Sequence, residues 1–339
     1  MDNYYKIIAD NASFDINKIT NKHFAITGAT GYIGSNLINF LAYLNRTNNL
    51  NIRITAYCTD LKKAQAILQP SSHLELIVCK NEDFSSNIIP ANIDYFIHTA
   101  SPTKSKFFVE NPVETIDASV IGISKILSSL KNHQLSRLIY LSSMEAYGDF
   151  NSVAAENNLG YIDLSNPRSS YPEGKRISEL YCNTYAAEYN IPISICRLAM
   201  CFGPGILPTE NRAYMSFIKQ AKSQNKITLQ SSGESSLNFI SILDALSAII
   251  FIATSENTIG TFNLCCDYEN ASIRTLAEHI GAYYGVPVTV LNEKSTIFAN
   301  DNKMVLSNEK IKNIGYKQIF NLEQTINSLI KYVEENENI

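Results

Sequence analysis

The sequence predicts an α/β fold in which a doubly wound parallel sheet carries helices on both faces and is joined to a smaller C-terminal lobe. Apolar runs without polar alternation, such as 138–141, alternate along the chain with amphipathic segments, which is typical of strands buried on both sides. A turn with three glycines joins the first apolar run to the segment after it. The chain has 339 residues, 45% of them hydrophobic and 18% charged, which suits a large folded core.

Strands and helices are expected in turn along the first 200 residues. Gly34–Leu44, for example, places Leu37, Ile38 and Leu41 on one helical face. The predicted strands are His23–Thr27, Ile52–Cys58, Leu74–Cys79, Ile93–Thr99, Leu138–Ser142 and Ile193–Arg197. The predicted helices are Gly34–Leu44, Lys62–Leu68, Val113–Leu130 and Ser169–Tyr189, followed later by Ser272–Gly281 and Leu322–Glu335.

The domain organisation follows from a change of rhythm after Arg197, where the regular alternation of strands and helices ends. Residues 1–20 precede the first strand and are expected to pack on the surface as an N-terminal extension. We assign residues 21–199, with 238–267 returning to the sheet, to a cofactor-binding domain. Residues 200–237 and 268–339 are assigned to a substrate-binding lobe.

Composition excludes several classes of function. The formal charge of −4 argues against nucleic acid as a partner, because phosphate binding usually leaves a basic surface. No apolar run is long enough to span a bilayer, and the polar start does not resemble a signal peptide. The seven cysteines include no C-x-x-C pair, and the five histidines show no ligand spacing, so we expect a cytoplasmic protein with free thiols and no metal.

The glycine turn, Gly28-x-x-Gly31-x-x-Gly34, follows a strand and opens a helix. The first glycine permits a tight turn, the second lets backbone amides approach a pyrophosphate, and the third lets the helix pack closely on the strand. This predicts a Rossmann-type dinucleotide site at a helix N-terminus. The expected cofactor contacts are Gly28, Thr30, Gly31, Tyr32, Ile33 and Gly34, with Ala100 and Ser101 after the fourth strand.

The end of the second strand bears on the choice of cofactor. An acidic residue there would bind the adenosine ribose and repel a 2′-phosphate, and this place is taken by Cys58. Thr59 and Lys62 are available to hold a phosphate, so NADP (as NADPH) is favoured. NAD stays open because Asp60 lies two residues further on.

A second motif, Tyr171-Pro172-Glu173-Gly174-Lys175, places a phenol and an ammonium four residues apart on one helix face. A nearby ammonium favours the phenolate and suits Tyr171 to proton transfer. The motif lies about 30 residues after a strand end that carries Ser143 and Glu145, which is where an open α/β sheet binds its ligand.

Taken together, these motifs resemble the extended short-chain dehydrogenases/reductases, in particular the NAD-dependent epimerase/dehydratase family. The resemblance covers about residues 22–335. It implies that Ser143 hydrogen-bonds the reacting oxygen, Tyr171 transfers the proton and Lys175 orients the ribose. It also implies a nucleotide-activated sugar as substrate and a homodimer formed through the helices 113–130 and 169–189.

Departures from the family pattern narrow the expected chemistry. Met144 stands where related dehydratases carry an acidic Asp, and Leu237 where related glucuronate decarboxylases carry an Arg, while the carboxylate of Glu145 is retained. Besides Ser143, Met144 and Glu145, the expected substrate contacts are Thr103, Lys104, Arg212 and Asn238.

The predicted activity is NADPH-dependent reduction of a nucleotide-diphosphate-linked keto-sugar or ketose, because such a reduction needs the fewest catalytic groups. CDP-linked compounds for surface polysaccharide synthesis are the first expectation, since the motifs resemble family members encoded beside cytidylyltransferases. The alternative is a nucleotide-sugar 4-epimerase, with a dehydratase or decarboxylase ranked lower. A catalytically silent NADP-sensing regulator is the alternative of another class.

Overall fold

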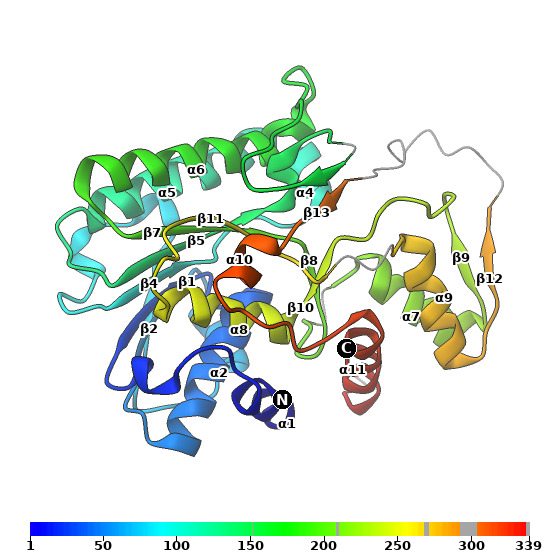
Figure 1. Ribbon diagram of the computed structural model, residues 1–339, viewed down its shortest axis with the longest axis horizontal. Coiled ribbons are helices and arrows are strands. Elements are labelled where there is room, and N and C mark those ends of the chain that lie inside the picture. The colour runs from blue at the N-terminus through cyan, green and yellow to red at the C-terminus, as the bar shows by residue number, and fades with distance from the viewer. Residues whose placement is uncertain (151, 208–209, 268–270, 292–303, 337–339) are drawn as a thin grey trace.

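The central sheet contains seven parallel strands, and this confirms the predicted fold class. The computed structural model describes residues 1–150, 152–207, 210–267, 271–291 and 304–336. The strands follow the order β11-β7-β5-β4-β1-β2-β3 (Figure 1). Their bounds are β1 His23–Thr27, β2 Arg53–Cys58, β3 Leu74–Val78, β4 Tyr95–His98, β5 Arg137–Ser143, β7 Ile193–Leu198 and β11 Gly260–Leu264. The strand order reverses between β1 and β4, which is the place where open α/β sheets bind ligands.

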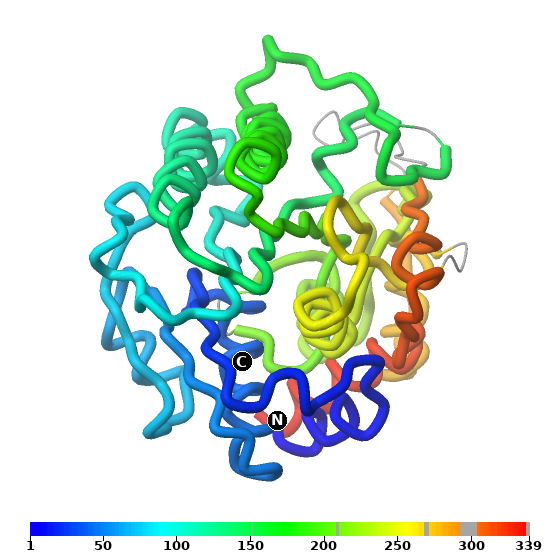
Figure 2. Tube along the Cα trace, turned by 60° about the vertical axis from the view of Figure 1, so that its left-hand side comes forward, coloured from blue at the N-terminus to red at the C-terminus, as the bar shows by residue number. Residues whose placement is uncertain are grey.

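Helices cover both faces of this sheet (Figure 2). One face packs against α2 (Tyr32–Asn48), α3 (Leu61–Ile67) and α8 (Ile242–Thr254), whose apolar side chains share one buried cluster. The other face packs against α5 (Pro112–Leu130) and α6 (Ser170–Tyr189), which lie side by side. The apolar strands predicted from the sequence are therefore covered from above and below.

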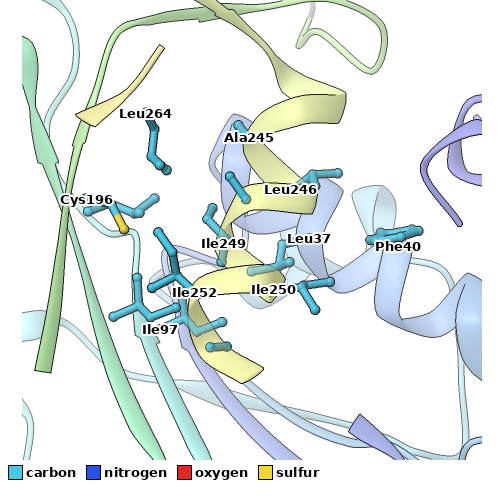
Figure 3. Packing of buried hydrophobic residues seen from close by; sticks show 14 of the residues in the cluster. Leu37, Phe40, Ile97, Cys196, Ala245, Leu246, Ile249, Ile250, Ile252 and Leu264 are labelled. Carbon is cyan, nitrogen blue, oxygen red and sulfur yellow. The ribbon is translucent and has the colours of Figure 1, made fainter. Parts of the chain in front are cut away.

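Helix α8 forms the centre of the first face. Every one of its residues is buried. Figure 3 shows Ile249 and Ile252 of α8 among side chains from α2, β4, β7 and β11, including Leu37, Ile97 and Leu264. A helix that is apolar on all sides requires burial on all sides, and this position supplies it.

The C-terminal part of the chain builds a second apolar cluster beside the sheet. It contains α7 (Ala213–Gln224), α9 (Ile273–Tyr284) and α11 (Leu322–Glu335), together with the paired strands β9 (Ile227–Leu229) and β12 (Val288–Val290). Helices α9 and α11 both begin with capping boxes, formed by Ser272 with Thr275 and by Asn321 with Gln324. We refer to this cluster and its elements as the lobe.

Shorter elements connect the sheet with the lobe. β8 (Met200–Phe202) pairs with β10 (Phe239–Ser241), and β6 (Val153–Ala154) pairs with β13 (Val305–Leu306). α4 (Ser105–Glu110) follows β4, and α10 (Glu309–Asn313) follows β13. Within the described residues, no helix has the length and apolar character needed to cross a membrane.

The N-terminal extension differs from the surface segment that we expected. It forms α1 (Asp2–Asp10) and a 3₁₀ turn at Ile16–Ile19. Tyr5, Ile8 and Ile19 are fully buried in the same cluster as α2 and α8. The segment is therefore part of the hydrophobic core.

Candidate active site

The glycine turn lies where β1 and β4 end side by side. Gly28 has φ +71°, and a Cβ built on it would lie 2.5 Å from Oγ1 of Thr99. That hydroxyl donates to the carbonyl of Thr27 over 2.7 Å. The loop after β4 is therefore in direct contact with the glycine turn. A Cβ on Gly34 would overlap the carbonyl oxygen of Gly28. The first and third glycines are therefore required by close packing.

The start of α2 suits an anion. Gly31 precedes the helix, and among the described residues no side chain caps it. Its first amides, including those of Tyr32 and Ile33, therefore lack the usual capping partner, and the helix dipole places partial positive charge there. Thr30 is half-buried beside the turn. These features fit the pyrophosphate of a dinucleotide.

The residues expected to distinguish NAD from NADP lie at the end of β2. Cys58 is buried, and burial raises the pKa of its thiol. Thr59 and Lys62 are exposed. The carboxylate of Asp60 accepts a hydrogen bond of 3.0 Å from the backbone N–H of Lys63 and so caps α3. An acidic side chain is thus fixed beside the place where adenosine ribose would lie.

Tyr171 occupies the first turn of α6 and points into the protein. Its ring stacks on Phe108 of α4, with centroids 4.2 Å apart and planes within 6°. Burial and the charge of Glu145 raise the pKa of Tyr171 to about 12, against the opposing effects of a hydrogen bond with Ser143 and the charge of Arg212. The expectation that the nearby ammonium would favour the phenolate is therefore wrong for this arrangement: burial dominates, and it favours the neutral phenol, which is hydrogen-bonded to Ser143.

Lys175 lies one turn further along α6 and is only 3% exposed. Its Nζ donates to the carbonyl of Leu141 over 2.8 Å and lies 5.0 Å from the ring centre of Tyr140 and 5.8 Å from that of Tyr171. Burial lowers the pKa of this ammonium to about 8, and the charge of Glu179 opposes that shift. Ser143, Tyr171 and Lys175 are thus brought together as the motif predicts.

Glu145 is held by an ion pair that the sequence does not reveal. Its carboxylate lies 2.6 Å from Arg168, and both side chains are about one-third exposed. The Arg168 guanidinium also lies 5.4 Å from the ring centre of Phe108. The backbone N–H of Glu145 donates to Oγ of Ser143 over 3.2 Å. Glu145 therefore lies beside the Ser143–Tyr171 pair with its charge already balanced.

The sequence matches the NAD dependent epimerase/dehydratase family over residues 24–265. The chain belongs to this family. It is therefore an enzyme of the extended short-chain dehydrogenase/reductase type. A nicotinamide dinucleotide, the cofactor class expected from the glycine turn, is the one that the family's name specifies.

Individual relatives agree with this assignment. The chain is 26% identical to UDP-glucuronic acid decarboxylase 1 of Xenopus tropicalis over 319 residues, which is 92% of this chain and 72% of that protein. An epimerase from Methanothermobacter thermautotrophicus shares the fold with a TM-score of 0.82 and 20% identity, covering 95% of this chain and 94% of that one. The UDP-glucuronic acid 4-epimerase of Bacillus cereus, solved with UDP-glucuronic acid and NAD, gives a TM-score of 0.78 at 20% identity and covers 93% and 99% of the two chains.

The predicted substrate contacts of this family member lie in different environments. Arg212 immediately precedes α7 without capping it through its side chain. Its guanidinium lies 3.5 Å from Glu210, and its charge lowers the pKa of Tyr171. The amide of Asn238 donates to the carbonyl of Met304 and accepts from the N–H of Leu306, each over 2.8 Å, so it anchors the strand β13. Thr103 and Lys104 are exposed at the start of α4.

The remaining predicted contacts lie near the glycine turn or beside Ser143. The backbone N–H of Ala100 lies close to Gly28, and Ser101 donates to the carbonyl of Pro102 over 3.2 Å. Met144 is half-buried between Ser143 and Glu145. The role of each of these residues toward a ligand stays a prediction.

Sequence reasoning missed one buried ionic group behind the catalytic residues. Glu179 accepts from Ser142 over 2.5 Å and forms an ion pair of 2.7 Å with Arg197, and both charged side chains are buried. Glu179 lies four residues beyond Lys175 on α6, so the spacing Tyr-x-x-x-Lys-x-x-x-Glu was a signal that could have revealed it. Arg197 ends a strand predicted from the sequence, but its pairing with Glu179 was not predicted.

Proposed function

We propose that this protein is a 4-epimerase of a nucleotide-diphosphate sugar that works with bound NAD. The observation that carries the proposal is the buried group formed by Ser143, Tyr171 and Lys175. A phenol hydrogen-bonded to a serine and backed by an ammonium suits reversible proton transfer at a single carbinol. NAD, when bound, would accept a hydride from the sugar carbon and return it to the opposite face of the resulting ketone, while the hydroxyl proton is exchanged with Tyr171.

The residues present favour chemistry at that carbinol alone. Half-buried Met144 cannot donate the proton that expels water in a dehydration. Leu237 packs in the apolar cluster of the lobe and is 7% exposed, so it offers no cation to a sugar carboxylate. Epimerisation needs neither group, because only a proton and a hydride leave the carbinol, and both return, the hydride to the opposite face.

The reductase that the sequence first suggested receives less support. The named relatives are a glucuronic acid decarboxylase and epimerases, and both kinds of reaction leave the cofactor in its starting oxidation state. A reductase would instead consume one NADPH per product. The silent regulator is opposed by the intact group around Tyr171 and Lys175.

Each residue would have a distinct task. Tyr171 would take the hydroxyl proton of the sugar and later return it. Lys175 lies close enough to the Tyr171 ring to stabilise the phenolate, and its own ammonium would hold the ribose of the cofactor. Ser143 would hydrogen-bond the same sugar oxygen. Arg212, whose charge faces Tyr171 from the lobe, would bind a phosphate of the nucleotide.

We propose NAD rather than NADP as the physiological cofactor. Asp60 is fixed at the end of β2, where its charge would repel a 2′-phosphate, and the Bacillus cereus epimerase was solved with NAD. Isothermal titration calorimetry should show tighter binding of NAD than of NADP. Asp60→Asn should reduce the difference between the two affinities, because it removes the charge that repels the 2′-phosphate. Tighter binding of NADP by the natural protein would restore the cofactor expected from Cys58.

The decisive experiment follows the product and the cofactor together. The protein with NAD is incubated with UDP-glucose, UDP-N-acetylglucosamine, UDP-glucuronic acid or CDP-glucose, and the sugar is analysed by NMR. We expect one of these sugars to convert into its 4-epimer without net change in absorbance at 340 nm, and Tyr171→Phe to abolish the conversion. Steady NADPH consumption with a keto-sugar would instead establish the reductase, and release of carbon dioxide the decarboxylase.

The outer face of α5 and α6 supports a homodimer. Val113, Ile116 and Ile121 on α5 and Ile177 and Leu180 on α6 are exposed, and apolar patches of this kind mark interfaces. Light scattering after size exclusion should give twice the chain mass, and Leu180→Glu should give monomers. Leu164→Glu, on an exposed residue outside these helices, is the matched control. A monomeric natural protein would contradict this assembly.

The state of the cysteines supports a reducing compartment. All seven are free thiols, and six of them are buried. We therefore place the protein in the cytoplasm, where thiols stay reduced. Secretion of the natural protein into the medium or periplasm would refute this.

A further inference from the structure

Residues 1–20 lie outside the stretch that matches the family, which begins at residue 24. They nevertheless contact both the sheet helices and the chain leading into the lobe. Asp2 forms an ion pair of 2.9 Å with Arg46 of α2. The hydroxyl of Ser13 accepts from the backbone N–H of Lys317, a few residues before α11, over 2.9 Å. Residues 1–20 therefore contact both α2, the helix that follows the glycine turn, and the chain just before α11 of the lobe.

The contact of α1 with α2 is made through a buried tyrosine. The hydroxyl of Tyr5, which is fully buried, donates to Oδ1 of Asn36 over 3.2 Å. The other end of that amide, Nδ2, donates to the carbonyl of Tyr32 over 2.8 Å and to that of Gly205 over 3.2 Å. Only Nδ2 can donate to the two carbonyls, so Oδ1 is the end of the Asn36 amide that is left to accept from Tyr5.

The loop 203–205 receives this contact, and it connects β8 with the part of the chain that enters the lobe. Tyr32, at the start of α2, donates from its hydroxyl to the carbonyls of Gly203 and Pro204 over 2.9 and 3.2 Å. Gly205 has φ +74°, and a Cβ on it would overlap Oδ1 of Asn36 and lie 3.0 Å from the methyl carbon of Met1. The loop 203–205 is thus in close contact with both α2 and the residue that precedes α1.

The same helix also contacts the lobe directly. The hydroxyl of Tyr4 donates to the carbonyl of Ser328 on α11 over 3.2 Å, and Figure 1 shows α1 beside α11. Tyr4 and Tyr5 are neighbours in sequence, and they face α11 and α2 respectively. One short helix therefore joins the helix of the glycine turn to a helix of the lobe.

We propose that α1 is a brace that holds the lobe in a fixed position relative to the glycine turn, and that Tyr5 and Asn36 are its positioning residues. The Tyr5 hydroxyl supplies the partner of Oδ1 of Asn36, and Nδ2 of the same amide binds loop 203–205 to α2. Without the Tyr5 hydroxyl, buried Oδ1 has no partner, and the arrangement in which Nδ2 binds the loop becomes less stable. The loop is then free to leave α2, and a ligand that contacts both parts meets a less ordered site.

The test compares two tyrosine-to-phenylalanine variants by hydrogen exchange of the cofactor-free full chain. Tyr5→Phe removes the hydroxyl that contacts Asn36. Tyr43→Phe is the matched control. Tyr43 lies on α2, is buried, and packs its ring against that of Tyr5. Its hydroxyl has no hydrogen-bond partner among the described residues. Asn36→Asp keeps the acceptor for Tyr5 and removes the donor to the carbonyls of Tyr32 and Gly205. It provides a second test should Tyr5→Phe fail to fold.

Amide exchange in residues 202–207 should rise roughly fivefold in Tyr5→Phe, the effect of losing one buried hydrogen bond, and by more in Asn36→Asp, which loses two. Exchange in β5 should stay at the natural rate, and Tyr43→Phe should behave like the natural protein throughout. Equal exchange of 202–207 in the two tyrosine variants would overturn the proposal. A uniform rise that includes β5 would also overturn it, because Tyr5 would then add only global stability. Neither readout depends on the reaction proposed above.

Discussion

Replacing Lys175 with methionine is expected to stabilise the cofactor-free protein at pH 7 while removing its activity. Burial lowers the pKa of this lysine from 10.5 to about 8, so the folded protein holds the proton less tightly than the unfolded chain does. Keeping the ammonium charged in the folded state at pH 7 therefore costs about 3 kcal/mol. Methionine has a similar length and carries no charge, and it removes this cost.

The gain is reduced by two contacts that methionine cannot make. Nζ donates to the carbonyl of Leu141 and lies over the ring of Tyr140. Losing these contacts costs about 1–2 kcal/mol. The net stabilisation at pH 7 is then about 1–2 kcal/mol. The cost of the charge is fully present below pH 8 and disappears as the pH rises toward 10.5, since the unfolded lysine then loses its proton too.

Urea unfolding of the cofactor-free proteins at pH 7 and pH 10 measures this difference. The difference in unfolding free energy between Lys175→Met and the natural protein should change by about 2–3 kcal/mol between the two pH values, so that the natural protein becomes the more stable one at pH 10. Lys219→Met, which changes an exposed lysine on α7, is the control and should show no such trend. A difference in unfolding free energy between Lys175→Met and the natural protein that stays constant from pH 7 to pH 10 would refute the reasoning. Burial of the charged ammonium would then not destabilise the folded protein.

Three further predictions concern the site. Tyr171→Phe keeps the stacked ring and should fold and bind NAD, but its initial rate should fall about 100-fold or more because the proton donor is lost; retention of most activity would move that role to another acid. Glu145→Gln should also lower the rate at least ~100-fold if Glu145 contacts substrate, whereas a near-normal rate would make its pairing with Arg168 structural. Gly34→Ala should abolish NAD binding in calorimetry, because its Cβ would overlap the carbonyl of Gly28; normal affinity would show that the turn can relax.

The parts of the site that lie close together in sequence were predictable. Tyr171 and Lys175 share a helix face by spacing, and the glycine turn carries its own conformational signature. The helix after the turn begins two residues earlier than predicted and continues to Asn48. Its polar last turn, which ends at left-handed Asn49, hid that extension from a criterion based on apolar spacing.

Contacts between distant segments were not predictable from local pattern. The ion pair of Glu145 with Arg168 joins two short 3₁₀ helices, Met144–Tyr147 and Pro167–Ser169. Nothing in the sequence of either segment indicates the other. The burial of Tyr5 depends on α2 and α8, and α8 lies more than 200 residues away in sequence. The sequence pattern shows that α1 has an apolar side but does not show what covers it.

The position of α8 and β11 has a consequence for biosynthesis. Both are needed to cover and complete the sheet, yet they are among the last sheet elements to leave the ribosome, after about three-quarters of the chain has been made. Until then, one apolar face of the nascent sheet and the edge strand β7 face water. A growing chain in that state is a target for aggregation and for chaperones. Ribosome-bound chains stalled before residue 242 should therefore recruit chaperones far more strongly than chains released at full length.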